Sequence, residues 1–278
     1  MTLGKPYAEV IGDPVDHSKS PLIHEFWLAQ LGLAGDYRKC RVASSELARY
    51  FRERRSDPSW RGCNVTIPHK QSVLAYLDDV AKDARRIGAV NVVVPRDGAL
   101  TGWNSDVNGV AAALRGVDIK GSAVVMVGAG GAARAAAAYL GDCGVRRLTI
   151  LARDPTRAQG LRALVPETDI EILPLTGARS LDDEPAAVIN ASPLGMSGGA
   201  AMPRELLDEL IRHAPTALFF DMVYAPLETE FIAAGRRGGA AIADGLTMLI
   251  GQAASAFGHF FLEAPPETNS GLRDLLAQ

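Results

Sequence analysis

The most informative segment for the fold of this chain is Val124-Val125-Met126-Val127-Gly128-Ala129-Gly130-Gly131-Ala132-Ala133. A short apolar run typical of a buried strand enters a glycine-rich turn, and the alanines after it predict a helix over Ala132–Tyr139. Gly128 permits the tight turn, Gly130 lets the backbone approach a pyrophosphate, and the small Ala133 allows close packing of helix on strand. Because the first turn of a helix has free N–H groups, the stretch predicts a dinucleotide site. The alternative is a turn whose glycines serve packing only.

Apolar segments of the same kind recur along the second half of the chain and alternate with helical ones. Expected strands are Ala123–Val127, Arg147–Leu151, Ile170–Leu173, Ala187–Asn190, Leu218–Met222 and Ala240–Ile242, and a further helix is expected over Arg204–His213. This alternation predicts a parallel sheet with helices on both faces. We therefore expect a Rossmann-type domain over residues 106–245.

The first half of the chain has its own strand pattern. Expected strands are Tyr7–Ile11, Tyr37–Val42, Cys63–Ile67, Val90–Val94 and Ala99–Trp103, the last two joined by a turn at Arg96-Asp97-Gly98. A helix over Ser105–Leu114 would lead into the second sheet, and the long apolar helix Leu246–Leu262 would return the chain to the first. The prediction is an α/β protein of two domains, with an αβα substrate-binding domain formed by 1–105 and 246–278. A cleft between the domains would be the natural ligand site.

Composition excludes several classes of protein. Of the 278 residues 47% are apolar and 22% charged, which is typical of a globular chain, and the net charge of −3 gives no reason to expect nucleic acid or an anionic membrane as a partner. Three scattered cysteines without CxxC spacing predict reduced thiols rather than disulfides or zinc. The five histidines do not have metal-ligand spacing, and the mixed charges of Arg52-Glu53-Arg54-Arg55 predict a solvated face. Without a signal layout or a run of ~20 apolar residues, we expect a soluble, cytoplasmic protein.

The end of the second Rossmann strand bears on the choice of cofactor. An NAD site usually has an acidic residue there to hold the ribose 2′-hydroxyl, whereas this chain has Ala152 followed by Arg153, with Arg157 one helical turn later. Guanidinium groups at this place would pair with a 2′-phosphate, which favours NADP. Asp154 leaves NAD open, because its carboxylate could turn toward a 2′-hydroxyl. The two arginines could also be merely solvated.

Polar residues follow the expected strands of the first domain. Ser18 and Ser20 place two hydroxyls on one short loop that suits a carboxylate or polyol, although Ser20 could simply cap a helix that begins at Pro21. Pro68 fits the first position of another helix and would place Lys70 in its first turn. Asp106 begins a third helix, and a Lys70–Asp106 pair in a cleft would be a proton-transfer unit at a carbonyl carbon. Taken alone, each of the two is more often a surface charge.

These segments together strongly resemble the shikimate dehydrogenase family. The resemblance is carried by Ser18-Lys19-Ser20-Pro21, Asn64-Val65-Thr66-Ile67-Pro68-His69-Lys70, Gly88-Ala89-Val90-Asn91, Gly102-Trp103-Asn104-Ser105-Asp106, the glycine loop, Asn190-Ala191-Ser192-Pro193-Leu194-Gly195-Met196, Asp221-Met222-Val223-Tyr224-Ala225-Pro226 and Asp244–Gln252. The motifs stand in the family's order and span nearly the whole chain. The resemblance implies the reversible, NADPH-dependent reduction of 3-dehydroshikimate to shikimate in aromatic amino-acid biosynthesis.

The resemblance also implies a role for single residues. Ser18 and Ser20 would hold the substrate carboxylate with Tyr224 nearby, and Lys70 would be the catalytic acid and base paired with Asp106. The substrate hydroxyls would be contacted by Thr66, Asn91, Asp106 and Gln252. The dinucleotide would be bound by Gly128, Ala129, Gly130, Gly131, Ala132, Arg153 and Arg157, with Met222 and Gly245 flanking the nicotinamide.

The chain departs from the family pattern at a few positions. Glu25 stands for the usual asparagine after His24, Val92 for a threonine after Asn91, and Ser105 for a threonine that also has a hydroxyl. At the cofactor strand, Ala152-Arg153-Asp154 replaces Asn-Arg-Thr, which weakens the case for NADP. An NAD-dependent quinate/shikimate dehydrogenase and a regulator that binds the metabolite without turnover are therefore the alternatives. Monomer and homodimer both remain open.

Overall fold

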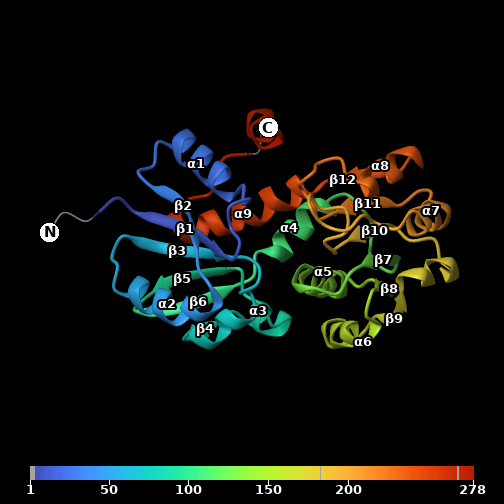
Figure 1. Ribbon diagram of the computed structural model, residues 1–278, viewed down its shortest axis with the longest axis horizontal. Helices are drawn as coiled ribbons and strands as arrows, with labels where there is room; N and C mark the ends of the chain where they lie inside the picture. Colours follow the sequence, from blue (N-terminus) through green and yellow to red (C-terminus); the bar gives the residue numbers. More distant parts are fainter. Residues whose placement is uncertain (1–3, 182, 268) are drawn as a thin grey trace. The chain divides into compact units, whose positions relative to one another are not determined.

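The computed structural model describes residues 4–181, 183–267 and 269–278, which form two compact units (Figure 1). The first unit comprises the chain up to Ser105 together with Gln252–Gln278, and the second comprises Asp106–Gly251. The second division falls inside the long helix α9 (Gly245–Phe261), whereas the sequence placed it at the start of that helix. Both units are layered α/β structures, and the predicted fold class is confirmed.

A six-stranded mixed sheet forms the centre of the first unit. Its strands lie in the order β2-β1-β3-β5-β6-β4, with bounds β1 Tyr7–Gly12, β2 Asp36–Arg41, β3 Trp60–Val65, β4 Asp79–Val80, β5 Val92–Arg96 and β6 Ala99–Trp103. The β1–β2, β1–β3 and β4–β6 pairs are parallel, and the β3–β5 and β5–β6 pairs are antiparallel. The remaining elements are α1 Ser20–Leu31, η1 Ser44–Glu46, α2 Leu47–Arg55, η2 Ser72–Tyr76, α3 Lys82–Ile87 and α10 Ser270–Ala277.

Alternation along β1 explains why both faces of this sheet are covered. Tyr7 and Ile11 belong to the apolar cluster that includes Tyr50 and Phe51 of α2, whereas Ala8 and Val10 belong to the cluster that includes Phe260 of α9. Because successive side chains of a strand point to opposite faces, a strand buried along its whole length needs a helical layer on each side. The chain after Gly251 supplies one of these layers.

The predicted hairpin turn between β5 and β6 is confirmed. Arg96 pairs with Ala99, so the loop has two residues, and both of them have positive φ, 51° at Asp97 and 82° at Gly98. This is the geometry of a type I′ turn, whose twist matches the flanking strands and which favours Asp-Gly. Local sequence is therefore sufficient to set the register of this pair.

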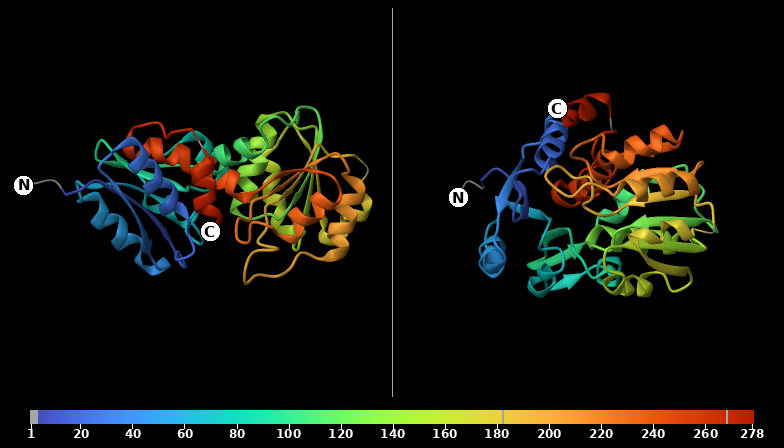
Figure 2. Two further views of the ribbon diagram at one scale, coloured as in Figure 1. Left: turned by 90° about the horizontal axis from the view of Figure 1, so that it is seen from above. Right: turned by 45° about the vertical axis from the view of Figure 1, so that its right-hand side comes forward.

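The second unit has a parallel sheet with helices on its two faces, as Figure 2 shows. Its strands lie in the order β12-β11-β10-β7-β8-β9, with bounds β7 Ala123–Val127, β8 Arg147–Ala152, β9 Asp169–Pro174, β10 Ala187–Asn190, β11 Leu218–Asp221 and β12 Ala241–Ala243. The other elements are α4 Asp106–Ala113, α5 Gly131–Asp142, α6 Pro155–Ala158, η3 Gln159–Leu164, η4 Leu175–Ser180, α7 Arg204–His213 and α8 Glu230–Arg237. Counted within the unit, this is the 3-2-1-4-5-6 order of dinucleotide-binding domains.

Two local predictions are wrong. Pro68 does not begin a helix: the Thr66 carbonyl accepts a hydrogen bond from the His69 N–H at 2.9 Å, which closes a turn, and the regular 3-10 helix η2 begins only at Ser72. Arg52, Glu53 and Arg55 are exposed as predicted, but Arg54 is not, because its guanidinium Nε lies 2.6 Å from the carboxylate of Glu9, which is buried in β1. The second difference arises from a contact between residues distant in sequence, which a local charge pattern does not show.

Candidate functional site

The glycine loop of the second unit combines one crowded and one open glycine. Gly128 has φ +109°, and a Cβ there would lie 2.8 Å from the Ala191 carbonyl oxygen, so β7 and the loop after β10 approach too closely for any side chain. A Cβ on Gly130 would meet nothing within 4 Å. Helix α5 begins at the next residue, and among the described residues no side chain caps its first turn. Open space before uncapped N–H groups is what a phosphate requires.

A pocket of about 250 Å³ lies at the carboxyl ends of β7, β8 and β10. It is lined by Val127, Gly128, Ala129, Gly130, Leu151, Ala152, Arg153, Asp154, Arg157, Leu175, Ala191, Ser192, Pro193 and Leu194. Strands β7 and β10 are neighbours at the point where the strand order reverses. Ligands of open parallel sheets bind in the crevice outside this point, so the pocket lies where a dinucleotide is expected.

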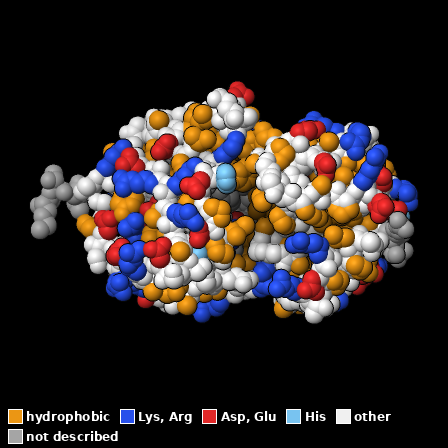
Figure 3. Space-filling model, viewed as in Figure 1, with side chains coloured by type: hydrophobic (Ala, Val, Ile, Leu, Met, Phe, Trp, Pro, Cys, Tyr) orange, Lys and Arg blue, Asp and Glu red, His pale blue; other side chains and the backbone are white. Residues whose placement is uncertain are grey.

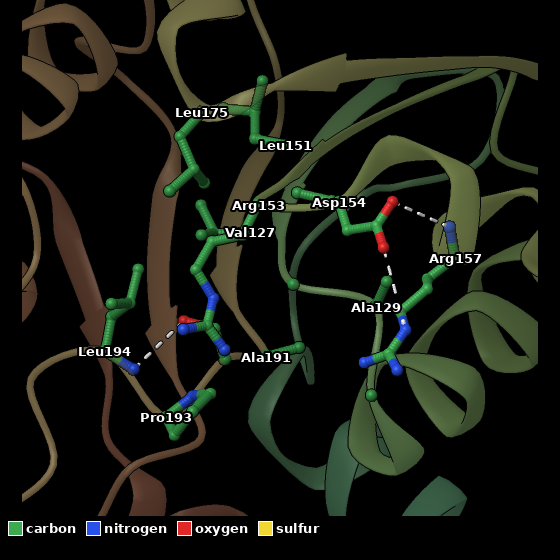
Figure 4. A pocket seen from close by; sticks show the side chains of 14 residues that line it. Val127, Ala129, Leu151, Arg153, Asp154, Arg157, Leu175, Ala191, Pro193 and Leu194 are labelled. Carbon is green, nitrogen blue, oxygen red and sulfur yellow. Dashed lines mark hydrogen bonds and ion pairs between the residues drawn. The ribbon is translucent and has the colours of Figure 1, made fainter. Parts of the chain in front are cut away.

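Asp154 is directed at the helix after β8. Its carboxylate accepts hydrogen bonds from the backbone N–H of Thr156 at 3.0 Å and of Arg157 at 3.4 Å, and so caps α6. The carboxylate also lies 3.7 Å from Nε of Arg157. Figure 4 shows the exposed side chain of Arg153, directly after β8, directed toward Pro193 and Leu194, and that of Arg157, on α6, directed toward Ala129. Two guanidinium groups thus border the pocket, while the Asp154 carboxylate caps α6.

A buried polar network holds the loop after β10, which forms one wall of the pocket. The Asn190 side chain donates to Asp221 at 2.9 Å and accepts from the Ser192 hydroxyl at 2.7 Å. Asp221 also accepts from the Thr229 hydroxyl at 2.6 Å and from the Val223 N–H at 2.9 Å. Burial raises the pKa of Asp221 to about 6, against these hydrogen bonds, which lower it. The motifs around Asn190 and Asp221 carried the family resemblance, but a sequence pattern does not show that they bond to each other.

Met222, Tyr224 and Gly245 lie together after β11 and β12. Met222 donates its N–H to the Asn190 carbonyl at 3.0 Å, and burial raises the pKa of Tyr224. Gly245 begins α9 against the backbone of Val223 and Tyr224, where a Cβ would overlap the Val223 carbonyl. Glycine is therefore required at 245 for this close approach.

In the first unit, Ser18 lies on the loop between β1 and α1, and Ser20 lies where that loop enters α1. The Ser18 hydroxyl accepts from the Ser20 N–H at 3.3 Å, and Ser20 is the first residue of α1. The N-cap residue is Lys19, and among the described residues no side chain caps this helix, so the alternative of Ser20 as its cap is wrong. The Ser20 hydroxyl, which is buried, instead bonds to the Tyr37 side chain.

The turn from Thr66 to Lys70 is anchored to three neighbouring segments. The Thr66 N–H donates to Ile11 at 2.9 Å, and the Lys70 carbonyl accepts from Val90 at 2.7 Å. His69 is buried with Nε2 at 2.6 Å from the Val42 carbonyl, so this nitrogen carries the proton and donates. Hydrogen bonds to three segments therefore fix the backbone that carries the half-buried side chain of Lys70.

A chain of buried hydrogen bonds links the expected substrate residues of this unit. The Tyr37 hydroxyl donates to Asn64 at 2.5 Å, and the Asn64 amide donates to the Asn91 carbonyl at 3.1 Å. The Asn91 amide donates to the Ser105 hydroxyl at 3.1 Å, and that hydroxyl donates to Gln252 at 3.3 Å. Sequence reasoning named Asn91 and Gln252 but missed Tyr37 and Asn64. Asn64 is a polar side chain in the largely buried strand β3, which is a sequence signal, whereas Tyr37 lies in the mostly polar strand β2 and has no such signal.

The structure places Lys70 in the first unit and Asp106 at the start of the second. Asp106 is buried as the first residue of α4, directly after Ser105. The pairing of Lys70 with Asp106 remains a prediction.

Comparison with known protein families identifies both halves of the chain. Residues 10–93 match the shikimate dehydrogenase substrate binding domain, and residues 110–222 match the family described as shikimate/quinate 5-dehydrogenase. The chain is 44% identical to a shikimate dehydrogenase (NADP(+)) from Sphingopyxis alaskensis, over 98% of this chain and 97% of the relative. The chain belongs to the shikimate dehydrogenase family.

Solved structures agree with this assignment. The shikimate 5-dehydrogenase of Thermus thermophilus, in complex with NADP(H) and shikimate, is 34% identical, covers 98% of both chains and superposes with a TM-score of 0.83. The quinate dehydrogenase of Corynebacterium glutamicum, in complex with NAD, is 31% identical, covers 98% of both chains and has a TM-score of 0.84. The fold is thus shared by relatives that differ in substrate and cofactor.

In the view of Figure 3, Lys and Arg side chains are interspersed with Asp and Glu side chains. None of the helices in the described part of the chain has the length and apolar character needed to cross a membrane.

Proposed function

We propose that this chain is an NADP-dependent shikimate dehydrogenase, which reversibly reduces 3-dehydroshikimate to shikimate in aromatic amino-acid biosynthesis. The observation that carries the proposal is the pocket at the glycine loop, bordered by Arg153 and Arg157 while Asp154 caps α6, in a chain closely similar to NADP(+) shikimate dehydrogenases. In this proposal the first unit with the beginning of α9 is the substrate domain, and the second unit binds the dinucleotide.

The cofactor fits the residues present. The open face of Gly130 and the first turn of α5 would receive the pyrophosphate, and the guanidinium groups of Arg153 and Arg157 would bind the 2′-phosphate. Met222 and Gly245 would flank the nicotinamide, which supplies or accepts a hydride when the dinucleotide is bound. Gly128, Ala129, Gly131 and Ala132 complete this proposed cofactor site.

The residues of the proposed substrate site would bind the substrate, orient it and donate a proton to it. Ser18 and Ser20 would hold the carboxylate, with Tyr224 nearby, and the anchored turn would present Thr66 and Lys70. Lys70 would give a proton to the carbonyl oxygen during reduction and take it back during oxidation, with Asp106 as its partner. The remaining hydroxyl contacts would come from Thr66, Asn91, Asp106 and Gln252, of which Asn91 and Gln252 are oriented by the buried chain through Ser105.

Steady-state assays that cross two cofactors with two substrates test the proposal. We expect the highest kcat/KM for NADP with shikimate, followed by the absorbance of the reduced nicotinamide. A higher kcat/KM for NAD with quinate would overturn the preference in favour of the activity named for the Corynebacterium relative. Binding of both ligands by calorimetry without turnover would identify a regulator instead.

We also propose that the enzyme works in the cytoplasm on its small-molecule substrate, as a monomer or a homodimer. The scattered cysteines Cys40, Cys63 and Cys143 are free, which suits a reducing compartment. Analytical ultracentrifugation distinguishes the two assembly states.

A further inference from the structure

Lys19 lies between the two serines proposed to hold the substrate carboxylate, and its side chain is committed to a distant part of the chain. Its ammonium donates a hydrogen bond to the backbone carbonyl of Leu276, in the last turn of α10. Helix α10 and the serine loop belong to the same compact unit, although more than two hundred residues separate them. Neither Lys19 nor α10 has a part in the proposed chemistry.

Helix α10 is a docked element with its own end signals. Its side chains Leu272 and Leu276 are fully buried, and the helix packs against α1. Gly271 lies at the ring of Phe26 on α1, and a Cβ there would be 3.9 Å from that ring. The Asn269 side chain accepts from the Leu272 N–H at 3.1 Å and caps the first turn. Position and direction of α10 are therefore fixed relative to α1.

The Lys19 contact suits the physics of a helix end. The last carbonyls of a helix have no partner within the helix and carry partial negative charge, so an ammonium there satisfies an acceptor and complements the dipole. At the other end of the bond, the loop is tight: the Ser18 N–H donates to the Val15 carbonyl at 3.0 Å, and the Ser20 N–H donates to the Ser18 hydroxyl. A side chain held at Lys19 limits how this short loop can rotate.

We propose that α10 positions the substrate-binding loop through Lys19, so that the hydroxyls of Ser18 and Ser20 are set before the carboxylate arrives. Lys19 is a positioning residue in this account, and the proposal rests on the proposed binding role of the two serines. Preorganisation of this kind lowers the cost of ordering the loop on binding and acts on substrate affinity rather than on the chemical step.

Four variants test the proposal by steady-state kinetics: Lys19→Ala, Lys19→Arg, a chain truncated after Glu267, and the truncation combined with Lys19→Ala. We expect Lys19→Ala and the truncation each to raise the KM for shikimate about fivefold, with kcat and the KM for NADP unchanged. Lys19→Arg should restore the KM, since a guanidinium can also donate to the Leu276 carbonyl. The combined variant should match the truncation alone, because the truncation already removes the Leu276 carbonyl to which Lys19 donates.

The outcomes separate the alternatives. If the two KM effects multiply in the combined variant, Lys19 acts on the substrate directly and the proposal is overturned; it is equally overturned if neither change alters KM. If the truncated chain does not fold, Leu272→Asp, which disrupts the buried face of α10, takes its place. Lys5→Ala, which breaks an exposed ion pair with Asp36 in the same unit, is the control and should leave KM unchanged. A wild-type protein without turnover of shikimate would instead refute the proposed function.

Discussion

At the end of β8, two adjacent residues have separate tasks. An acidic group near this position would argue for NAD, but the Asp154 carboxylate accepts two N–H groups of α6. A carboxylate that caps a helix is held by the N–H groups of the first helical turn, and it is therefore less available to a ribose hydroxyl. Arg153 and Arg157 then determine the charge that the pocket presents at this edge.

Arg153→Ala should separate the two cofactors. A guanidinium–phosphate hydrogen bond contributes about 1.5–3 kcal/mol, so we expect kcat/KM for NADP to fall by about one to two orders of magnitude while that for NAD hardly changes. Arg162→Ala, which removes another exposed arginine of the same unit, is the control. An equal loss with both cofactors would show that Arg153 does not contact the 2′-phosphate.

Lys70→Ala should impair the chemical step. Loss of a general acid and base lowers kcat by about 10² or more, while NADP binding measured by fluorescence titration should be unchanged. Lys120→Ala, at an exposed lysine of the second unit, is the matched control. Near-normal turnover of Lys70→Ala would exclude this residue as the proton donor.

The bounds of a helix or strand can be predicted from local sequence where the segment's own residues determine whether it is buried or exposed. The bounds of β6, β7, β10 and α7 are predicted to the residue, since the Asp-Gly turn before β6, the apolar runs of β7 and β10 and the helical pattern of α7 leave few alternatives. The turn before Lys70 could not be predicted in this way, because its conformation is set by hydrogen bonds to Ile11 and Val90. The buried chain from Tyr37 to Gln252 was missed for the same reason, as hydrogen bonds across strands leave no local pattern.

The glycine loop offers a prediction in which two identical substitutions have different effects. Gly128→Ala meets a positive φ and the Ala191 backbone, so we expect a loss of folding stability of about 2 kcal/mol or more, measured by urea unfolding. Gly130→Ala has open space around it and should fold normally, but its methyl group would occupy the approach of the pyrophosphate and raise the KM for NADP. Equal stabilities of the two variants would contradict this division.

At the scale of the whole molecule, each unit contains a buried group with a shifted pKa. His24 is stacked on Tyr37 with ring centroids 4.0 Å apart, and neither of its ring nitrogens has a hydrogen-bond partner among the described residues. Burial lowers its pKa from 6.5 to about 3. The unfolded chain therefore binds a proton first, and stability falls as the pH drops below about 6.5. For Asp221 the sign is opposite: its pKa rises from 3.8 to about 6, so the stability that it contributes is present at low pH and lost as the pH rises to about 6.

His24→Phe should remove much of the acid sensitivity of the first unit. The substituted ring keeps the stack on Tyr37 but does not titrate, so at about pH 5 the variant should gain roughly 2 kcal/mol relative to the wild type when compared with about pH 8. Urea unfolding at the two pH values measures the difference. Parallel changes in wild type and variant would show that His24 is not the group responsible. Asp221→Asn serves as a second probe, and should reduce the loss of stability between about pH 4 and pH 6.

The division of the first unit into two separated stretches has a consequence for biosynthesis. The second unit is continuous and can fold once Gly251 has emerged from the ribosome, whereas the sheet of the first unit lacks its Phe260-bearing layer until the segment after Gly251 has emerged as well. On the ribosome, the segment up to Ser105 must therefore wait for the segment after Gly251, with the apolar face of β1 uncovered in the interval. Protease treatment of stalled nascent chains should find the second unit resistant and the first still cleavable. A chaperone that recognises extended apolar segments could bind β1 while the ribosome translates the codons for the second unit.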